Sequence, residues 1–310
     1  MNRTIFLISA VVVTIYFCAA CHQNKQTPPK VIYETNMCLS VDDVGGLAIL
    51  HALQNRGQAD LLAVCYNEIH PEGVAAIDAI NTWYGRPDMP IGVYRGAFPD
   101  PDTSAFLAAL TNFPHDLTHE NAPTALEVYR TVLREQPDHS VTIISVGFLN
   151  NLSDLVSNER ELVAKKVKEL VIMGSHVGDD HNLGFHDTLG DARNVLENWP
   201  TPIVFHHLGG DIMTGLGLEN TPADNPVREA YFEYFNHQFK NYSSWDPMTV
   251  LYGVLGETGY FKKNADGKGS HPSGYEWDLK TRNDAVLEAL LPAEEYARII
   301  EELLVASPVK

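Results

Sequence analysis

The sequence predicts an α/β protein with a Rossmann-like, mostly parallel central sheet that is flanked by helices. Short β-branched runs alternate with helical patterns over much of the chain, and this alternation is typical of βα units. Polar and acidic clusters follow the ends of several runs, where sheets of this kind gather their ligands. The pattern becomes more helical after residue 205, so we expect extra C-terminal helices.

The individual elements follow from these runs. The expected strands are 31–33, 61–66, 91–94, 141–146, 169–173 and 203–205. The expected helices between them are 44–55, 71–84, 124–136, 151–157 and 191–198. Beyond the last strand we expect helices at 226–240, 247–255 and 292–305, and a Gly-rich turn segment at 266–274. With 310 residues, of which 45% are hydrophobic, the chain can bury one large core, so we expect a single domain over 31–310.

The charge of the chain limits its partners. Its formal net charge is −18, and it has no basic stripe to offset the repulsion of phosphates. Nucleic acid is therefore excluded as a partner, and so is electrostatic binding to an anionic membrane surface.

The N-terminus has the pattern of a bacterial lipoprotein signal. Asn2 and Arg3 precede an apolar run, and the run ends in Cys18-Ala19-Ala20-Cys21, a small-residue cleavage pattern with cysteine at the cut. We expect a signal peptide over 1–20, a lipidated Cys21 and a tether over 21–30. The alternative is an uncleaved membrane anchor. Either form holds the domain outside the cytoplasm, and the first predicts a lipid anchor in the cell envelope, in the periplasm or at the surface.

Two cysteines, Cys38 and Cys65, remain in the domain. We expect both to be buried apolar side chains, with one disulfide as the alternative. No Cys/His spacing indicates zinc.

The loop after the first strand is the main candidate site. It runs from Glu34 through Asn36 and Ser40 to the adjacent carboxylates Asp42 and Asp43. Carboxylates at a strand end are oxygen ligands for a hard cation, although Asn36 and Ser40 stand where further carboxylates would make a stronger site. Asp246 opens a later helix, where it is either a plain N-cap or a site residue.

Several segments, in this order and spacing, resemble the inosine-uridine preferring nucleoside hydrolases over most of 31–306. They are the loop just described, 75–87, 90–93, 145–152, 171–174, 198–204 and 243–246. The resemblance implies calcium-dependent hydrolysis of the N-glycosidic bond of ribonucleosides or related ribosides. It also implies a homo-oligomer as one possible assembly.

The resemblance carries roles to single residues. The implied calcium ligands are Asp43, Asp246, the Val146 carbonyl and Asn36. The implied ribose-binding residues are Asp42 and Asn182, with Gly184 and the neighbouring Asp179, Asp180, His181, His186 and Asp187 as alternatives for the second.

Two positions depart from the family pattern. Asn36 stands where the family has the aspartate that serves as general base, and an amide cannot accept the proton of the attacking water. Trp245 stands where several members carry a histidine near the leaving base, so protonation by that residue is not available.

Two hypotheses follow. The first is a hydrolase with weakened activity, in which Glu34, Ser40 or one of the loop histidines His181 and His186 compensates for Asn36. The second is a catalytically inactive ligand-binding lipoprotein with the same fold. We interpret the adjacent pair His206 and His207 as structural, because neighbouring strand residues point to opposite faces.

Overall fold

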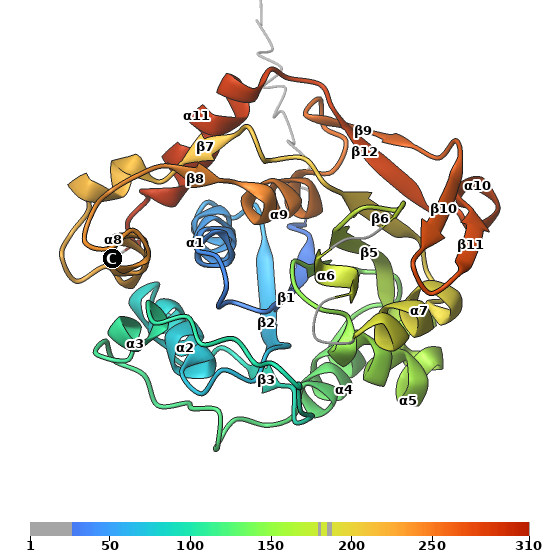
Figure 1. The fold of residues 1–310 in the computed structure, drawn as a ribbon, viewed down its shortest axis with the longest axis horizontal. Helices are drawn as coiled ribbons and strands as arrows, with labels where there is room; N and C mark the ends of the chain where they lie inside the picture. The colour runs from blue at the N-terminus through green and yellow to red at the C-terminus, as the bar shows by residue number, and fades with distance from the viewer. Residues whose placement is uncertain (1–26, 179–180, 185–187, 310) are drawn as a thin grey trace, which may run out of the picture.

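An eight-stranded sheet forms the centre of the computed structural model (Figure 1). The structure describes residues 27–178, 181–184 and 188–309. The predicted signal peptide and Cys21 lie outside the described residues, as do Asp179, Asp180, His186 and Asp187. Among the described residues, no helix combines the length and the apolar character that crossing a bilayer requires.

The sheet contains all six predicted strands. They are β1 (Lys30–Thr35), β2 (Asp60–Tyr66), β3 (Ile91–Val93), β4 (Val141–Ser145), β5 (Val167–Met173) and β6 (Ile203–His206). Their order is β3-β2-β1-β4-β5-β6, and each neighbouring pair is parallel. The chain therefore winds outward from β1 in one direction and then returns to β4 on the other side. This reversal opens a crevice at the carboxyl ends of β1 and β4.

The expected C-terminal helices are present, and strands that the sequence did not predict accompany them. Two further strands, β9 (Phe261–Asn264) and β12 (Ala285–Ala289), extend the central sheet beyond β6. β12 pairs parallel to β6 and antiparallel to β9. The segment expected as a Gly-rich turn forms most of a hairpin of β10 (Lys268–His271) and β11 (Tyr275–Asp278). β9 and β12 depend on pairing partners outside their own segments, so their own residues predict them poorly.

Helices cover both faces of the sheet (Figure 1). On one side lie α1 (Asp42–Asn55), α2 (Gly73–Trp83) and α9 (Trp245–Leu255), and α8 (Pro226–Tyr234) and α11 (Ala293–Leu304) pack on α1. On the other side lie α4 (Ala125–Glu135) and α5 (Asn150–Lys166), and α7 (Leu189–Asn198) packs on α5. The shorter elements are α3 (Leu107–Leu110), α6 (His181–Gly184), α10 (Leu279–Arg282), the 3-10 helix η2 (Leu216–Asn220) and the strand pair β7 (Met213–Thr214) and β8 (Tyr242–Ser243).

Two helix lengths differ from the prediction. α5 continues to Lys166 through a kink at Glu159, whose φ is −135°. α8 ends at Tyr234 instead of residue 240, because Asn236 and His237 adopt left-handed backbone conformations with φ of 53° and 64°, which interrupt a right-handed helix.

The expectation that the two cysteines of the domain are buried is confirmed. Cys38 and Cys65 are both free and buried. In the part of the chain that the structure describes, they form no disulfide.

Candidate functional site

A pocket of about 500 Å³ lies at the crevice between the ends of β1 and β4. It combines the loop after β1, the start of α1, the ends of β4 and β5, α6 and the start of α9. Its described lining residues are Asn36, Leu39, Ser40, Asp42, Asp43, Val146, Met173, Asn182, His207, Tyr234, Tyr242, Trp245 and Asp246. All six residues that the sequence singled out as ligands or substrate contacts therefore line one pocket.

Three carboxylates meet at the base of this pocket. One oxygen each from Asp42, Asp43 and Asp246 lies within 4.8 Å of the other two. Asp42 and Asp43 begin α1, and Asp246 lies in the first turn of α9, so the positive ends of two helix dipoles face the cluster. Ser244, not Asp246, is the N-cap residue of α9. The interpretation of Asp246 as a plain N-cap is therefore wrong.

Close packing of α1 and α9 brings the carboxylates together. A Cβ on Gly46 would lie 3.4 Å from the Asp246 Cβ and only 2.5 Å from the Tyr33 hydroxyl oxygen. Tyr33 in turn donates a 3.1 Å hydrogen bond to the Asp43 carbonyl. A larger residue at position 46 would therefore separate the two helix ends and open the cluster.

Asp43 is held in place by the loop that precedes it. Its Oδ1 accepts hydrogen bonds from the Thr35 hydroxyl and, at 3.1 Å, from the Met37 N–H. The Asp246 N–H lies 3.4 Å from Asp42 Oδ2. By contrast, the Oδ1 atoms of Asp42 and Asp246 are buried without a hydrogen-bond partner in the described part of the chain.

The electrostatics of the cluster are unfavourable for three free carboxylates. Burial, and next to it the charge of Asp42, raises the pKa values of Asp43 and Asp246 well above the ordinary range. Burial also raises the pKa of Asp42. Buried like charges with unpaired oxygens are stabilised when a cation joins them, and a hard, oxygen-seeking cation fits this set of donors.

Val146 and Asn182 lie beside the carboxylates. The Asn182 amide donates to the Val146 carbonyl at 2.9 Å and to the Met173 carbonyl at 3.1 Å. It thereby joins the ends of β4 and β5. The Val146 carbonyl keeps a second lone pair for a cation, whereas the Asn182 nitrogen is already engaged with the backbone. The roles assigned to both residues stay predictions.

Glu34 does not face the pocket. It is completely buried, and its carboxylate accepts hydrogen bonds from Tyr129, from Asn67 at 3.0 Å and from Asn151 at 2.7 Å. Burial raises the pKa of Glu34 to about 7. Glu34 therefore lacks the contact with the pocket that it would need to replace the general base at position 36.

Sequence reasoning missed the aromatic wall of the pocket. Tyr234, Tyr242 and Trp245 line it, with ring centroids 5.3 Å apart for the first pair and 6.0 Å for the second. The aromatic content of 231–245 was the available signal, but it could not show which rings face inward.

The histidine pair divides as its strand position predicts. His206 is buried, with Nδ1 3.2 Å from the Thr249 hydroxyl, and it lies outside the pocket lining. His207 is exposed and lines the pocket, a position that the sequence did not indicate. The side chain of His181 and the whole of His186 lie outside what the structure describes.

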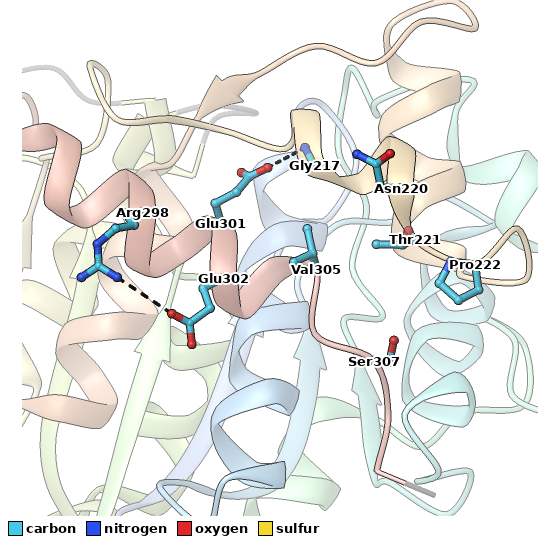
Figure 2. Close-up of a pocket in the computed structure, with 9 residues that line it drawn as sticks. All are labelled: Gly217, Asn220, Thr221, Pro222, Arg298, Glu301, Glu302, Val305 and Ser307. Carbon is cyan, nitrogen blue, oxygen red and sulfur yellow. Dashed lines mark hydrogen bonds and ion pairs between the residues drawn. The ribbon is translucent and has the colours of Figure 1, made fainter.

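A second hollow, of about 520 Å³, lies between α11 and η2 (Figure 2). Glu301 accepts 2.6 Å hydrogen bonds from the backbone N–H groups of Gly215 and Gly217. Arg298 lies 4.0 Å from Glu302. These charged groups satisfy one another or the backbone, so the acidic pocket is the better candidate site.

The comparisons with known proteins rest on the fold. No protein-family model matches the chain, and no curated protein matches it by sequence. Several solved structures do match.

An inosine-uridine preferring nucleoside hydrolase from Bacillus anthracis aligns with a TM-score of 0.67 and 15% identity, over 89% of this chain and 99% of that one. A purine-preferring ribonucleoside hydrolase from Gardnerella vaginalis aligns with a TM-score of 0.63 and 17% identity, over 89% and 99%. The type III effector protein XopQ, solved with adenosine diphosphate ribose, aligns with a TM-score of 0.68 and 16% identity, over 92% and 95%.

At these identities the likeness concerns the fold. The predicted α/β architecture is confirmed, and the chain has the fold of the solved nucleoside hydrolases.

Proposed function

We propose that this protein binds calcium and a ribose-containing small molecule in the acidic pocket, and that it hydrolyses N-ribosidic bonds slowly. The observation that carries the proposal is the buried group of Asp42, Asp43 and Asp246 in a pocket of about 500 Å³. One oxygen of each lies within 4.8 Å of the other two, and the Oδ1 atoms of Asp42 and Asp246 have no hydrogen-bond partner among the described residues. A pocket of this size suits a ligand as large as a nucleoside.

The residues would divide the work as follows. Asp43, Asp246, the Val146 carbonyl and the Asn36 amide oxygen would hold the cation, and Asp42 would accept a hydrogen bond from a ribose hydroxyl. When bound, calcium supplies positive charge that lowers the pKa of a ligated water and orients the sugar. The aromatic wall would hold the base beside the anomeric carbon.

The slow rate follows from the missing base. Asn36 can offer an oxygen to a cation but cannot take a proton, and a positioned general base contributes about 10² to 10⁴ in rate. Glu34 is enclosed by its own donors. The Ser40 hydroxyl hydrogen-bonds the Asp42 carboxylate, and a hydroxyl is itself a weak base.

The alternative is a ligand-binding protein without turnover, and the same residue, Asn36, favours it. Both functions use the same pocket and cation. For either one we propose export and lipid anchoring in the cell envelope, on the strength of the N-terminal pattern that ends at Cys21.

Calorimetric titration with calcium chloride tests the proposal on full-length protein freed of cations by a chelator. We expect one binding site in wild type and none in Asp43→Asn or Asp246→Asn. The matched control is Asp78→Asn, since Asp78 is also buried but accepts from the Asp116 and Leu117 N–H groups, outside the pocket lining.

Release of base from inosine and uridine is then followed with and without calcium. Slow, calcium-dependent release supports the hydrolase, and calcium-dependent binding without release supports the alternative. Failure of wild type to bind millimolar calcium would exclude both.

A further inference from the structure

The pocket has two chemically different walls. Carboxylates of Asp42, Asp43 and Asp246 form one, and the rings of Tyr234, Tyr242 and Trp245 contribute the other. A riboside that places its sugar on the acidic wall would therefore present its base to the aromatic one.

The charge of the lining selects against phosphates. Three carboxylates line the described part of the pocket, and none of its described lining residues is lysine or arginine. One divalent cation would neutralise two of the three charges, so the ionised site stays negative. Nucleotides would meet repulsion here, whereas a cationic ligand would be attracted.

The aromatic wall also favours a cationic ligand. The rings of Tyr234 and Tyr242 are inclined by 81°, and those of Tyr242 and Trp245 by 77°. Neighbouring rings that stand at right angles in this way offer both faces and edges to a flat ligand. Aromatic faces attract cations, and this wall lies beside a negative site.

The leaving group presents a further requirement. A neutral purine or pyrimidine leaves readily only when it is protonated, but an indole N–H and a phenol are weak acids at neutral pH. A base that already carries a positive charge on its ribosylated ring system needs no such proton.

Resting on the proposed riboside-hydrolase function, we propose that the pocket selects unphosphorylated ribosides with a cationic base, such as N-ribosyl pyridinium or N7-alkyl purinium compounds. In the reaction, the bond between C1′ and nitrogen breaks and its electron pair goes to the nitrogen, which neutralises the base. The oxygen of water bonds to C1′, and one water proton passes to solvent. The products are ribose, the neutral base and a proton.

The main test uses two ligands of nearly the same shape, nicotinamide riboside and its neutral 1,4-dihydro form. Calorimetry on the full-length protein with saturating calcium should give about tenfold tighter binding of the cationic form, the size of a cation–π contribution of about 1.4 kcal/mol. Nicotinamide mononucleotide, which adds a phosphate, should bind more weakly than nicotinamide riboside.

Tyr234→Leu should reduce the preference for the cationic form. Phe232→Leu is the matched control, since Phe232 lies in the same helix but packs on Phe239 outside the pocket lining, and it should leave the preference unchanged.

The outcomes separate the two proposals. Equal affinities for the cationic and neutral forms, with calcium and inosine both bound, would overturn the selection for cations and leave the proposed function standing. A protein that binds no riboside would overturn both.

Discussion

Asn151 donates a 2.7 Å hydrogen bond to the Glu34 carboxylate. This bond joins the end of β1 to the start of α5. The same carboxylate oxygen accepts from Asn67, whose own Oδ1 accepts from the Phe148 N–H at 3.1 Å. The loops after β1, β2 and β4 are thereby tied together behind the pocket. Glu34 supports the site from outside and does not enter it.

Replacing Glu34 tests this role. Glu34→Gln keeps an oxygen for the two asparagines, and its amide can donate to the Tyr129 oxygen, so we expect any hydrolysis rate to stay within about twofold of wild type. Glu34→Leu leaves those partners unsatisfied and should lower the free energy of unfolding by about 1–3 kcal/mol or more. Chemical denaturation and rate measurements check both. A rate loss of about 100-fold in a stable Glu34→Gln protein would instead identify Glu34 as a base.

Asn36→Asp should restore the missing base. We expect hydrolysis of inosine or uridine to rise by about 10² to 10⁴, and calcium to bind more tightly because the site gains a negative charge. Asn36→Ala is the control that removes the amide without adding a carboxylate, and it should not accelerate the reaction. An unchanged rate in Asn36→Asp would mean that contacts to the ribose are missing as well.

Gly147→Ala should damage the pocket by crowding. The added Cβ would lie 2.5 Å from the Asn36 backbone nitrogen and 2.5 Å from Asn67 Oδ1, so the loop after β1 must shift. We expect a loss of about 1–3 kcal/mol in unfolding free energy and weaker calcium binding. Gly190→Ala is the matched control, because its Cβ would meet no atom within 4 Å; it should bind calcium as wild type does.

The stability of the calcium-free protein should fall as pH rises. Burial and the charge of Asp42 raise the pKa of Asp43 to about 8, against about 3.9 in an unfolded chain. The folded protein therefore keeps a proton that the unfolded chain releases, and this stabilisation, complete below about pH 4, disappears towards about pH 8.

Thermal denaturation across this pH range measures the effect. Saturating calcium should raise the unfolding temperature most at high pH, where binding displaces no proton. Asp43→Asn should show a shallower pH dependence than wild type. A calcium-free protein whose stability is constant over the range would contradict the buried acidic cluster.

The sequence predicted those strands whose own residues form a continuous apolar run. The β-branched runs at 31–33 and 141–146 predicted β1 and β4 because a strand buried on both faces is apolar over its whole length. β9 and β12 were missed, since mixed runs such as Phe261–Asn264 become strands only where a neighbouring edge supplies hydrogen bonds.

For the site, the sequence by itself determined the chemistry: two adjacent aspartates after the first strand, a third before Pro247, and an amide at Asn36 in place of a base. These facts depend only on residue type and order. The tertiary structure alone decided that Glu34 is enclosed by donors, that three carboxylates converge, and that His207 and an aromatic wall line the pocket. The physical reason is that burial and contact distance arise from packing between segments as distant as Asp42 and Asp246, which no local pattern contains.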